Sequence, residues 1–117
     1  MARLSTHVLD TARGQAVANL KIDLHRLQSG VRQHCLTVRT NSDGRTDAPL
    51  LSGERIPTGL YELTFAAGEY FRAHGAALSQ PPFLDEIVVR FGIADGAANY
   101  HVPLLVSPYG YSTYKGT

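Results

Sequence analysis

The 117-residue sequence lacks the features that mark several large classes of protein. Its single cysteine, Cys35, cannot form an internal disulfide, which agrees with a reducing compartment. Its apolar runs extend over only a few residues, whereas a membrane-spanning helix needs roughly 20. Residues 1 to 3 lead into a polar segment instead of the apolar core of a signal peptide. We therefore expect a cytoplasmic protein without a membrane partner.

The sequence also lacks a strong charge of either sign. Its formal net charge is +1, and no basic stripe is present that would follow a phosphate backbone, so a nucleic-acid partner is not expected. A content of 44% hydrophobic and 18% charged residues is that of an ordinary globular protein. At this length the chain is expected to form one domain, residues 1–117, with a single core.

Several catalytic and cofactor motifs are missing as well. The sequence has no Gly-x-Ser-x-Gly elbow of a serine hydrolase and no glycine-rich phosphate loop. Its five histidines show neither His-x-His nor His-Glu-x-x-His spacing, which would concentrate them around zinc. We therefore predict a protein that uses no metal and no cofactor.

What the sequence does contain is a series of short β-rich segments separated by turns. Alternating apolar and polar residues predict half-buried strands, and β-branched runs predict buried ones. Residues 46 to 58 are expected to form a loop with at most a short edge strand, and residues 69 to 74 a helix of about two turns. The predicted strands cover residues 4–10, 20–27, 34–40, 60–65, 86–93 and 100–106, followed by a last strand after a Ser-Pro-Tyr-Gly turn. This pattern predicts an all-β antiparallel sandwich of two sheets, with about seven to eight strands and one short helix.

The last predicted hairpin has two faces of different character. Because side chains alternate along a strand, Tyr100, Val102, Leu104 and Val106 are expected in the core, and His101, Pro103 and Leu105 on the opposite face. An imidazole among apolar side chains is unusual on a face meant only for water, and it indicates a site or an interface. Proline has no N–H for the strand ladder, so a local irregularity is expected at Pro103.

The same alternation places His7 and Leu9 on one face of the first strand. If this strand is a neighbour of the strand that holds His101, the two imidazoles share a patch. In the last strand, Ser112 and Tyr114 are then expected beside the histidines, and Tyr111 in the core. A single histidine on a strand is usually solvated or packed, and this interpretation is kept for His25, His34 and His74.

Five segments, spread from one end of the chain to the other, resemble those of a known family. They are Ser5–Asp10 followed by Arg13–Gly14, Thr40–Arg45, Tyr100–Leu105, Ser107–Tyr109 and Tyr114–Thr117. Because these segments occur in this order, the sequence resembles the 5-hydroxyisourate hydrolases, the transthyretin-like enzymes of urate breakdown. The resemblance covers the whole domain and implies the transthyretin-like sandwich.

The resemblance also implies which residues act. His7, Arg45 and His101 would form the catalytic trio, and the C-terminal tetrapeptide would help to close the site. The implied assembly is a homotetramer with the sites between dimers, which would cover the apolar strip of Leu9, Pro103 and Leu105. The family's usual Tyr-Arg-Gly-Ser ending is here Tyr114-Lys115-Gly116-Thr117, so lysine replaces a planar, bidentate arginine. The residues expected to bind substrate are His7, Arg45, Ser112, Tyr114, Lys115 and Thr117.

These residue types suit the implied reaction, in which water opens a ring amide. Histidine, with a pKa near 6.5, can deprotonate water, and an arginine can stabilise the charge that develops on a carbonyl oxygen. The sequence leaves open which histidine is the base. Two other functions remain as alternatives. One is a small-molecule carrier, since transthyretin has the same fold without the two histidines, and the other is a secreted sandwich that binds a protein.

Overall fold

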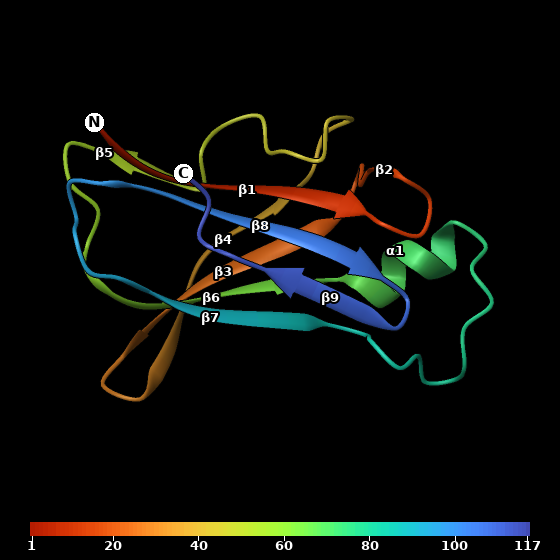
Figure 1. Ribbon diagram of the computed structural model, residues 1–117. Coiled ribbons are helices and arrows are strands. Elements are labelled where there is room, and N and C mark those ends of the chain that lie inside the picture. Colours follow the sequence, from red (N-terminus) through yellow and green to blue (C-terminus); the bar gives the residue numbers. More distant parts are fainter.

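The computed structural model describes all 117 residues, which form nine strands and one helix (Figure 1). One sheet contains β1 (Ala2–Asp10), β2 (Gln15–Ala16), β5 (Leu51–Gly53), β8 (Asn99–Ser107) and β9 (Gly110–Thr113). The other contains β3 (Lys21–Gln28), β4 (Val31–Arg39), β6 (Gly59–Phe65) and β7 (Ile87–Ile93). Helix α1 (Ala67–Ala73) follows β6, and it is too short to cross a membrane. The predicted two-sheet sandwich with one short helix is confirmed.

One strand pair differs from the rest. The order in the first sheet is β2-β1-β8-β9, with β5 also paired to β1, and in the second sheet it is β4-β3-β6-β7. All pairs are antiparallel except β1 and β8, which run in parallel. This pairing joins the two ends of the chain and confirms that the strands of His7 and His101 are neighbours. Its register sets Ser5 opposite His101 and His7 opposite Pro103.

The core lies between the two sheets and follows the predicted alternation. It consists of 22 buried hydrophobic residues, each of which contributes roughly 1.5–3 kcal/mol if it is a large aliphatic or aromatic side chain. Val102, Leu104 and Val106 are all buried, as predicted. The prediction for Tyr111 was wrong, because its side chain is 47% exposed. Tyr111 lies opposite the inward-facing Val106, but β9 is the edge of its sheet and nothing covers the ring there.

The irregularity expected at Pro103 is found on one side of β8 only, where the antiparallel pairing stops at Leu104 and Thr113 and reappears as a single bridge between His101 and Gly116. The parallel register between β1 and β8 runs unbroken through His7 and Pro103, and Pro103 is buried. Its carbonyl oxygen accepts a hydrogen bond from the hydroxyl of Thr113, the last residue of β9. The N–H and C=O of one residue point to the same side of a strand, so an N–H at residue 103 would point toward the side of β9. The ladder to β9 has already ended there, and the missing donor of proline therefore breaks no bond of that ladder.

Two strand boundaries also differ from the prediction for a local reason. Ser29 and Gly30 both have positive φ, as the two central residues of a type I′ turn require, so β3 and β4 form one long hairpin. β4 therefore begins at Val31, three residues before the predicted strand. The short β5 agrees with the predicted edge strand, whereas β2 was not anticipated.

A buried carboxylate ties the end of β1 to the helix. Asp10 is 1% exposed, and its Oδ1 accepts hydrogen bonds from the backbone N–H groups of Ala12 and Arg13. The hydroxyl of Tyr70 in α1 donates to Oδ2 across 2.9 Å. Burial, together with this carboxylate, raises the pKa of Tyr70. Because all these partners meet at Asp10, the C-terminal end of β1 is fixed relative to the second sheet.

Candidate active site

The turn between residues 41 and 45 positions Arg45 against β1. The Asn41 side-chain oxygen accepts hydrogen bonds from the N–H groups of Asp43 and Arg45, at 2.9 and 3.2 Å. Gly44 has φ near 75°, and its carbonyl accepts from the Val8 N–H across 2.8 Å. A Cβ atom at Gly44 would overlap the Val8 carbonyl oxygen, so only glycine lets the turn approach the strand this closely.

His7 is held by the same turn. Its Nε2 atom lies 2.9 Å from the carbonyl oxygen of Asp43. Since a carbonyl oxygen can only accept, the hydrogen in this bond belongs to Nε2. A neutral His7 therefore has its lone pair on Nδ1, and its Nε2 proton is already engaged.

His101 lies across the sheet from Ser5, and its Nδ1 is 2.8 Å from the Ser5 hydroxyl oxygen. Partial burial lowers the pKa of His101, and the nearby positive charge of Arg45 and the neighbouring His7 lower it further. A hydrogen bond with the backbone of Ser5 acts in the opposite direction, but the pKa remains below its usual value. His101 is therefore neutral at neutral pH, and it has no protein partner on Nε2.

The C-terminal tail crosses back over β8 and packs against His101 (Figure 1). The Gly116 N–H donates to the His101 carbonyl oxygen across 2.8 Å. A Cβ atom at Gly116 would lie 2.5 Å from Cδ2 of the imidazole, closer than real carbon contacts allow. The ring is thus confined between the tail and β1.

These groups surround a cavity of about 460 Å³ on the outer face of the first sheet. A second cavity of about 230 Å³ adjoins it, and Arg3, Ser5 and Arg45 belong to both. Arg3 was not predicted, although it shares the face of Ser5 and His7 by simple alternation along β1. The larger cavity is lined by Arg3, Ser5, Arg45, Asn99, Tyr100, His101, Gly116 and Thr117.

The structure brings together only part of the predicted substrate-binding set. Thr117 lines the larger cavity with Arg45 and His101. Ser112 is opposite Leu105 and shares the outer face, but it does not line that cavity.

Tyr114 and Lys115 lie in a different place within the protomer. They line a cavity of about 260 Å³ between β7 and the edge of the first sheet. The Lys115 Nζ lies 5.2 Å from the centre of the Tyr100 ring. The lysine is therefore engaged with an aromatic face and not with the histidines.

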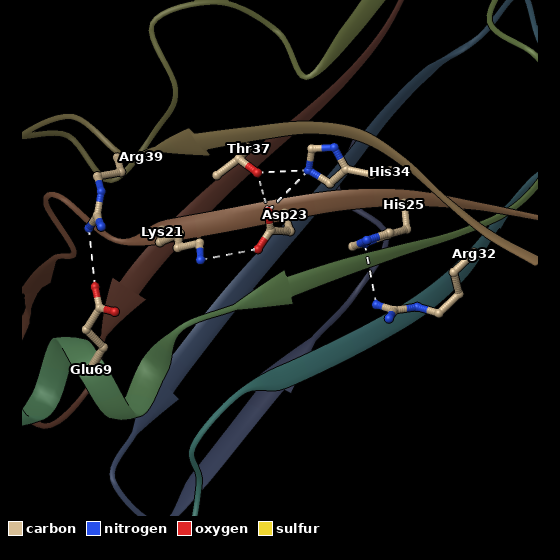
Figure 2. Close-up of polar contacts among 8 residues, drawn as sticks. All are labelled: Lys21, Asp23, His25, Arg32, His34, Thr37, Arg39 and Glu69. Atoms are coloured by element: carbon tan, nitrogen blue, oxygen red, sulfur yellow. Dashed lines mark hydrogen bonds and ion pairs between the residues drawn. The ribbon is translucent and has the colours of Figure 1, made fainter.

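His25 and His34 lie on β3 and β4 of the second sheet (Figure 2), and neither lines the cavity of His101. His34 Nε2 contacts the Thr37 hydroxyl at 2.8 Å and the Asp23 carboxylate at 3.4 Å (Figure 2). Burial raises the pKa of Asp23, but hydrogen bonds from Thr37 and His34 outweigh it and the pKa is lowered overall. These polar contacts belong to the outer face of the second sheet.

The outer face of the first sheet thus combines a neutral imidazole with two guanidinium groups around one cavity. A free lone pair on His101 can accept a proton, and Arg3 and Arg45 can stabilise negative charge beside it. A two-sheet sandwich of this topology defines the transthyretin-like class of proteins. The model of the HIUase/Transthyretin family matches residues 4–116, and the chain belongs to this family.

Individual relatives agree with this assignment. The chain is 56% identical to a 5-hydroxyisourate hydrolase of Ralstonia nicotianae over 100% of both chains. It superposes on the structure of Klebsiella pneumoniae 5-hydroxyisourate hydrolase with a TM-score of 0.82, at 30% identity and over 100% of both chains. It also superposes on sea bream transthyretin in complex with thyroxine, with a TM-score of 0.87 over 98% of this chain and 95% of the other. The identity to transthyretin is 23%, so that likeness concerns the fold alone.

Proposed function

We propose that this protein hydrolyses 5-hydroxyisourate, using water to open a ring amide. The product would be 2-oxo-4-hydroxy-4-carboxy-5-ureidoimidazoline, a step of urate and purine catabolism. The observation that carries the proposal is the neutral His101 beside Arg45, because this pairing supplies a base and an electrostatic partner in one cavity. Two relatives named 5-hydroxyisourate hydrolase, 56% and 58% identical over at least 96% of each chain, support the choice of substrate.

The proposed base is His101 and not His7. His101 lines the cavity with Arg45 and its Nε2 has no protein partner, whereas His7 does not line that cavity and donates its Nε2–H to the Asp43 carbonyl. In the reaction, Nε2 of His101 takes a proton from water, and the resulting hydroxide adds to the ring carbonyl carbon. The carbon–nitrogen bond then breaks, and the proton on His101 passes to the leaving nitrogen. Water is the only co-reactant.

Arg45 is proposed to stabilise the oxyanion that forms when hydroxide adds. A guanidinium is suited to this role, since it keeps its charge and donates in a fork. Arg3 adds a second positive charge in the same cavity. Hydrolysis of an amide leaves a carboxylate, so both cations also match the charge of the product.

The proposed assembly is a homotetramer with the sites at the interface between dimers. Two features of the outer face support it. Leu9 and Leu105 line a further cavity of about 380 Å³ that is open to solvent in one protomer, and a neighbouring subunit would cover it. Ser112, Tyr114 and Lys115 lie outside the cavity of His101 within the protomer, so their proposed contact with substrate requires a neighbouring subunit.

The test is to add the purified protein to freshly generated 5-hydroxyisourate and to follow the decay of its ultraviolet absorbance. We expect faster decay than in buffer, without added metal or cofactor, and no loss of rate with EDTA. Decay at the buffer rate would contradict the proposal. A carrier of the transthyretin kind would instead bind an aromatic ligand and leave the decay unchanged. The proposal also includes a cytoplasmic location, which fractionation of the source cells would test.

A further inference from the structure

We infer that the Ser5 hydroxyl is a positioning group that holds His101 in one tautomer, with the proton on Nδ1 and the lone pair on Nε2. This inference rests on the proposed function, because it concerns the residue proposed as the base. It assigns to Ser5 a role in the reaction that requires no contact with substrate. Strand register, the charges around the cavity and the tail beside the ring all bear on this role.

The parallel pairing of β1 with β8 creates the contact. The register sets Ser5 directly opposite His101, and both side chains point to the outer face, where each is half-buried. The Ser5 oxygen lies 2.8 Å from Nδ1, and it has no other hydrogen-bond partner in the protein. The Ser5 hydroxyl and the His101 imidazole are therefore the only hydrogen-bond partners of one another at this point of the sheet.

The charges around the cavity decide which partner donates. If the serine donated to Nδ1, a neutral His101 would carry its proton on Nε2. Arg3 and Arg45 line the same cavity as His101, and their guanidinium groups are donors only and would repel the positive dipole of that N–H. If the serine accepts, Nε2 instead carries a lone pair, which is electrostatically favourable near the two cations. The geometry therefore selects Ser5 as the acceptor.

The C-terminal tail keeps the ring in this orientation. A Cβ atom at Gly116 would lie 2.5 Å from Cδ2 and 3.2 Å from Cγ of His101, so the backbone of the tail is in direct contact with the ring. The Gly116 N–H also bonds to the His101 carbonyl. Gly116 thus restricts the ring plane, while Ser5 determines where the proton resides.

A serine beside a histidine is also the arrangement of a nucleophile and its base. In that arrangement a third group orients the other ring nitrogen, but Nε2 of His101 has no protein partner, and the only carboxylate side chain nearby, Asp47, lines the adjoining cavity and not that of His101. Ser5 therefore lacks the supporting group that an activated nucleophile requires. Detection of an acyl group on Ser5 by mass spectrometry during turnover would overturn the positioning role.

The direct test is nitrogen-15 NMR of the histidine side chains, which distinguishes a protonated ring nitrogen from an unprotonated one without measuring activity. In the wild-type protein near pH 7.5, we expect His101 with its proton on Nδ1. Ser5→Ala should shift the population toward the Nε2 proton, and Ser5→Thr, which keeps a hydroxyl, should restore the original state. A wild-type His101 with its proton on Nε2, or a Ser5→Ala variant with an unchanged spectrum, would overturn the inference.

Kinetics provide a second readout, because a positioning role and a purely structural role of Ser5 predict shifts of the pH profile in opposite directions. Ser5→Ala should lower kcat by at least about tenfold, part of the roughly 100-fold effect of a general base, with little change in KM. A hydroxyl that accepts from Nδ1 favours the protonated imidazole, so its loss should lower the pKa of His101 and move the acid limb of the pH profile to lower pH. A purely structural role would loosen and hydrate the ring, and would move this limb to higher pH instead. The charged and titratable groups that face the ring, Arg3, His7 and Arg45, are unchanged in this variant.

The two measurements also separate this inference from the proposed function. If the tautomer shifts in Ser5→Ala but turnover stays normal, the hydrogen bond is as described and His101 is not the base. If the wild-type protein does not hydrolyse 5-hydroxyisourate, the function is wrong, yet the NMR result still decides the tautomer. If the spectrum does not respond to Ser5→Ala, the inference fails whatever the activity.

Discussion

His7 donates a hydrogen bond from Nε2 to the carbonyl oxygen of Asp43, two residues before Arg45, across 2.9 Å. This bond joins the first strand of the chain to the turn that carries the arginine. The same turn accepts the Val8 N–H through Gly44. The position of Arg45 therefore depends on β1, and β1 also pairs with β8, the strand that holds His101.

The first prediction concerns the chemistry of His101 and Arg45. His101→Asn and Arg45→Ala should each lower kcat/KM by at least about 100-fold, the usual contribution of a general base or of an oxyanion donor. Both side chains are partly exposed, so the melting temperature should stay nearly constant. Steady-state rates and thermal unfolding of the same samples check this. Near-normal turnover in either variant would place the site elsewhere.

The second prediction concerns the pKa of His101. Burial lowers this pKa most, and the charge of Arg45 is the next cause. A neutral base stays active until the pH falls through its pKa, so activity should persist below the ordinary histidine value of about 6.5. In Arg45→Ala the pKa should rise toward that value, and an NMR titration of the imidazole measures it even where turnover is slow.

The matched control for this titration is Arg39→Ala. Arg39 lies on the second sheet, where it pairs with Glu69 across 3.3 Å (Figure 2). Its removal changes the net charge by the same amount, and it should leave the His101 titration unchanged. Equal shifts in both variants would show that net charge, and not the position of Arg45, controls the imidazole.

The third prediction separates two costs of replacing a glycine. Gly44 and Gly30 have nearly the same φ, 75° and 76°, but a Cβ atom meets the Val8 carbonyl at Gly44 and nothing within 4 Å at Gly30. Gly30→Ala should therefore cost about 1 kcal/mol for the left-handed backbone alone. Gly44→Ala should cost about 3 kcal/mol, because the turn must also move away from β1.

Urea unfolding of both variants measures this difference in stability. The rate of hydrolysis by each variant shows whether the site is intact. Gly44→Ala should also lose activity, since Arg45 and the acceptor of His7 move with the turn. Gly30→Ala should keep its activity because it lies in the β3–β4 hairpin. Equal loss of stability in the two variants would argue against the close approach of the turn to Val8.

Much of this architecture could be predicted from the sequence because it depends on local alternation. The inward residues of β1 and β8 follow the period of two, and so does the outward pair His7 and His101. Tyr111 was misplaced because alternation gives the face of a side chain but not what covers it. Tyr111 faces inward at a sheet edge and remains 47% exposed.

Other features depend on contacts between distant segments, which no local pattern contains. The tautomer of His7 depends on a carbonyl 36 residues away, and that of His101 on a serine 96 residues away. Arg3 carries no motif, and only the parallel pairing of β1 with β8 brings it to the same cavity as His101. Tyr114 and Lys115 could not be placed because the chain leaves β9 after Thr113, where strand alternation ends.

The fourth prediction concerns the tail over the imidazole. Gly116→Ala places a methyl group 2.5 Å from Cδ2 of His101, so either the ring or the tail must move. We expect kcat/KM to fall by about tenfold or more, with a small change in stability, because the tail is outside the core. Gly110→Ala is the control, since its Cβ meets only the Ser107 hydroxyl at 3.8 Å. Equal activity in the two variants would exclude a role for the tail in holding the ring.

The last prediction concerns the proposed tetramer. Leu105 is half-buried on the outer face of the first sheet, near Leu9, while the adjacent Leu104 and Val106 point into the core. Leu105→Glu should leave the fold intact but place a charge, repeated by symmetry, in the interface between dimers, which costs several kcal/mol. We expect unchanged circular dichroism, a smaller mass by light scattering and reduced activity.

The control for assembly is Leu60→Glu, which introduces the same charge on β6 of the second sheet. Leu60 is 50% exposed there, and the proposed interface does not include that sheet. Leu60→Glu should therefore keep the mass and the activity of the wild-type protein. If Leu105→Glu remains a tetramer with normal activity, the outer face of the first sheet is not the interface. If only Leu60→Glu dissociates, the subunits meet through the second sheet, and the cavity of His101 is open to solvent in the assembly.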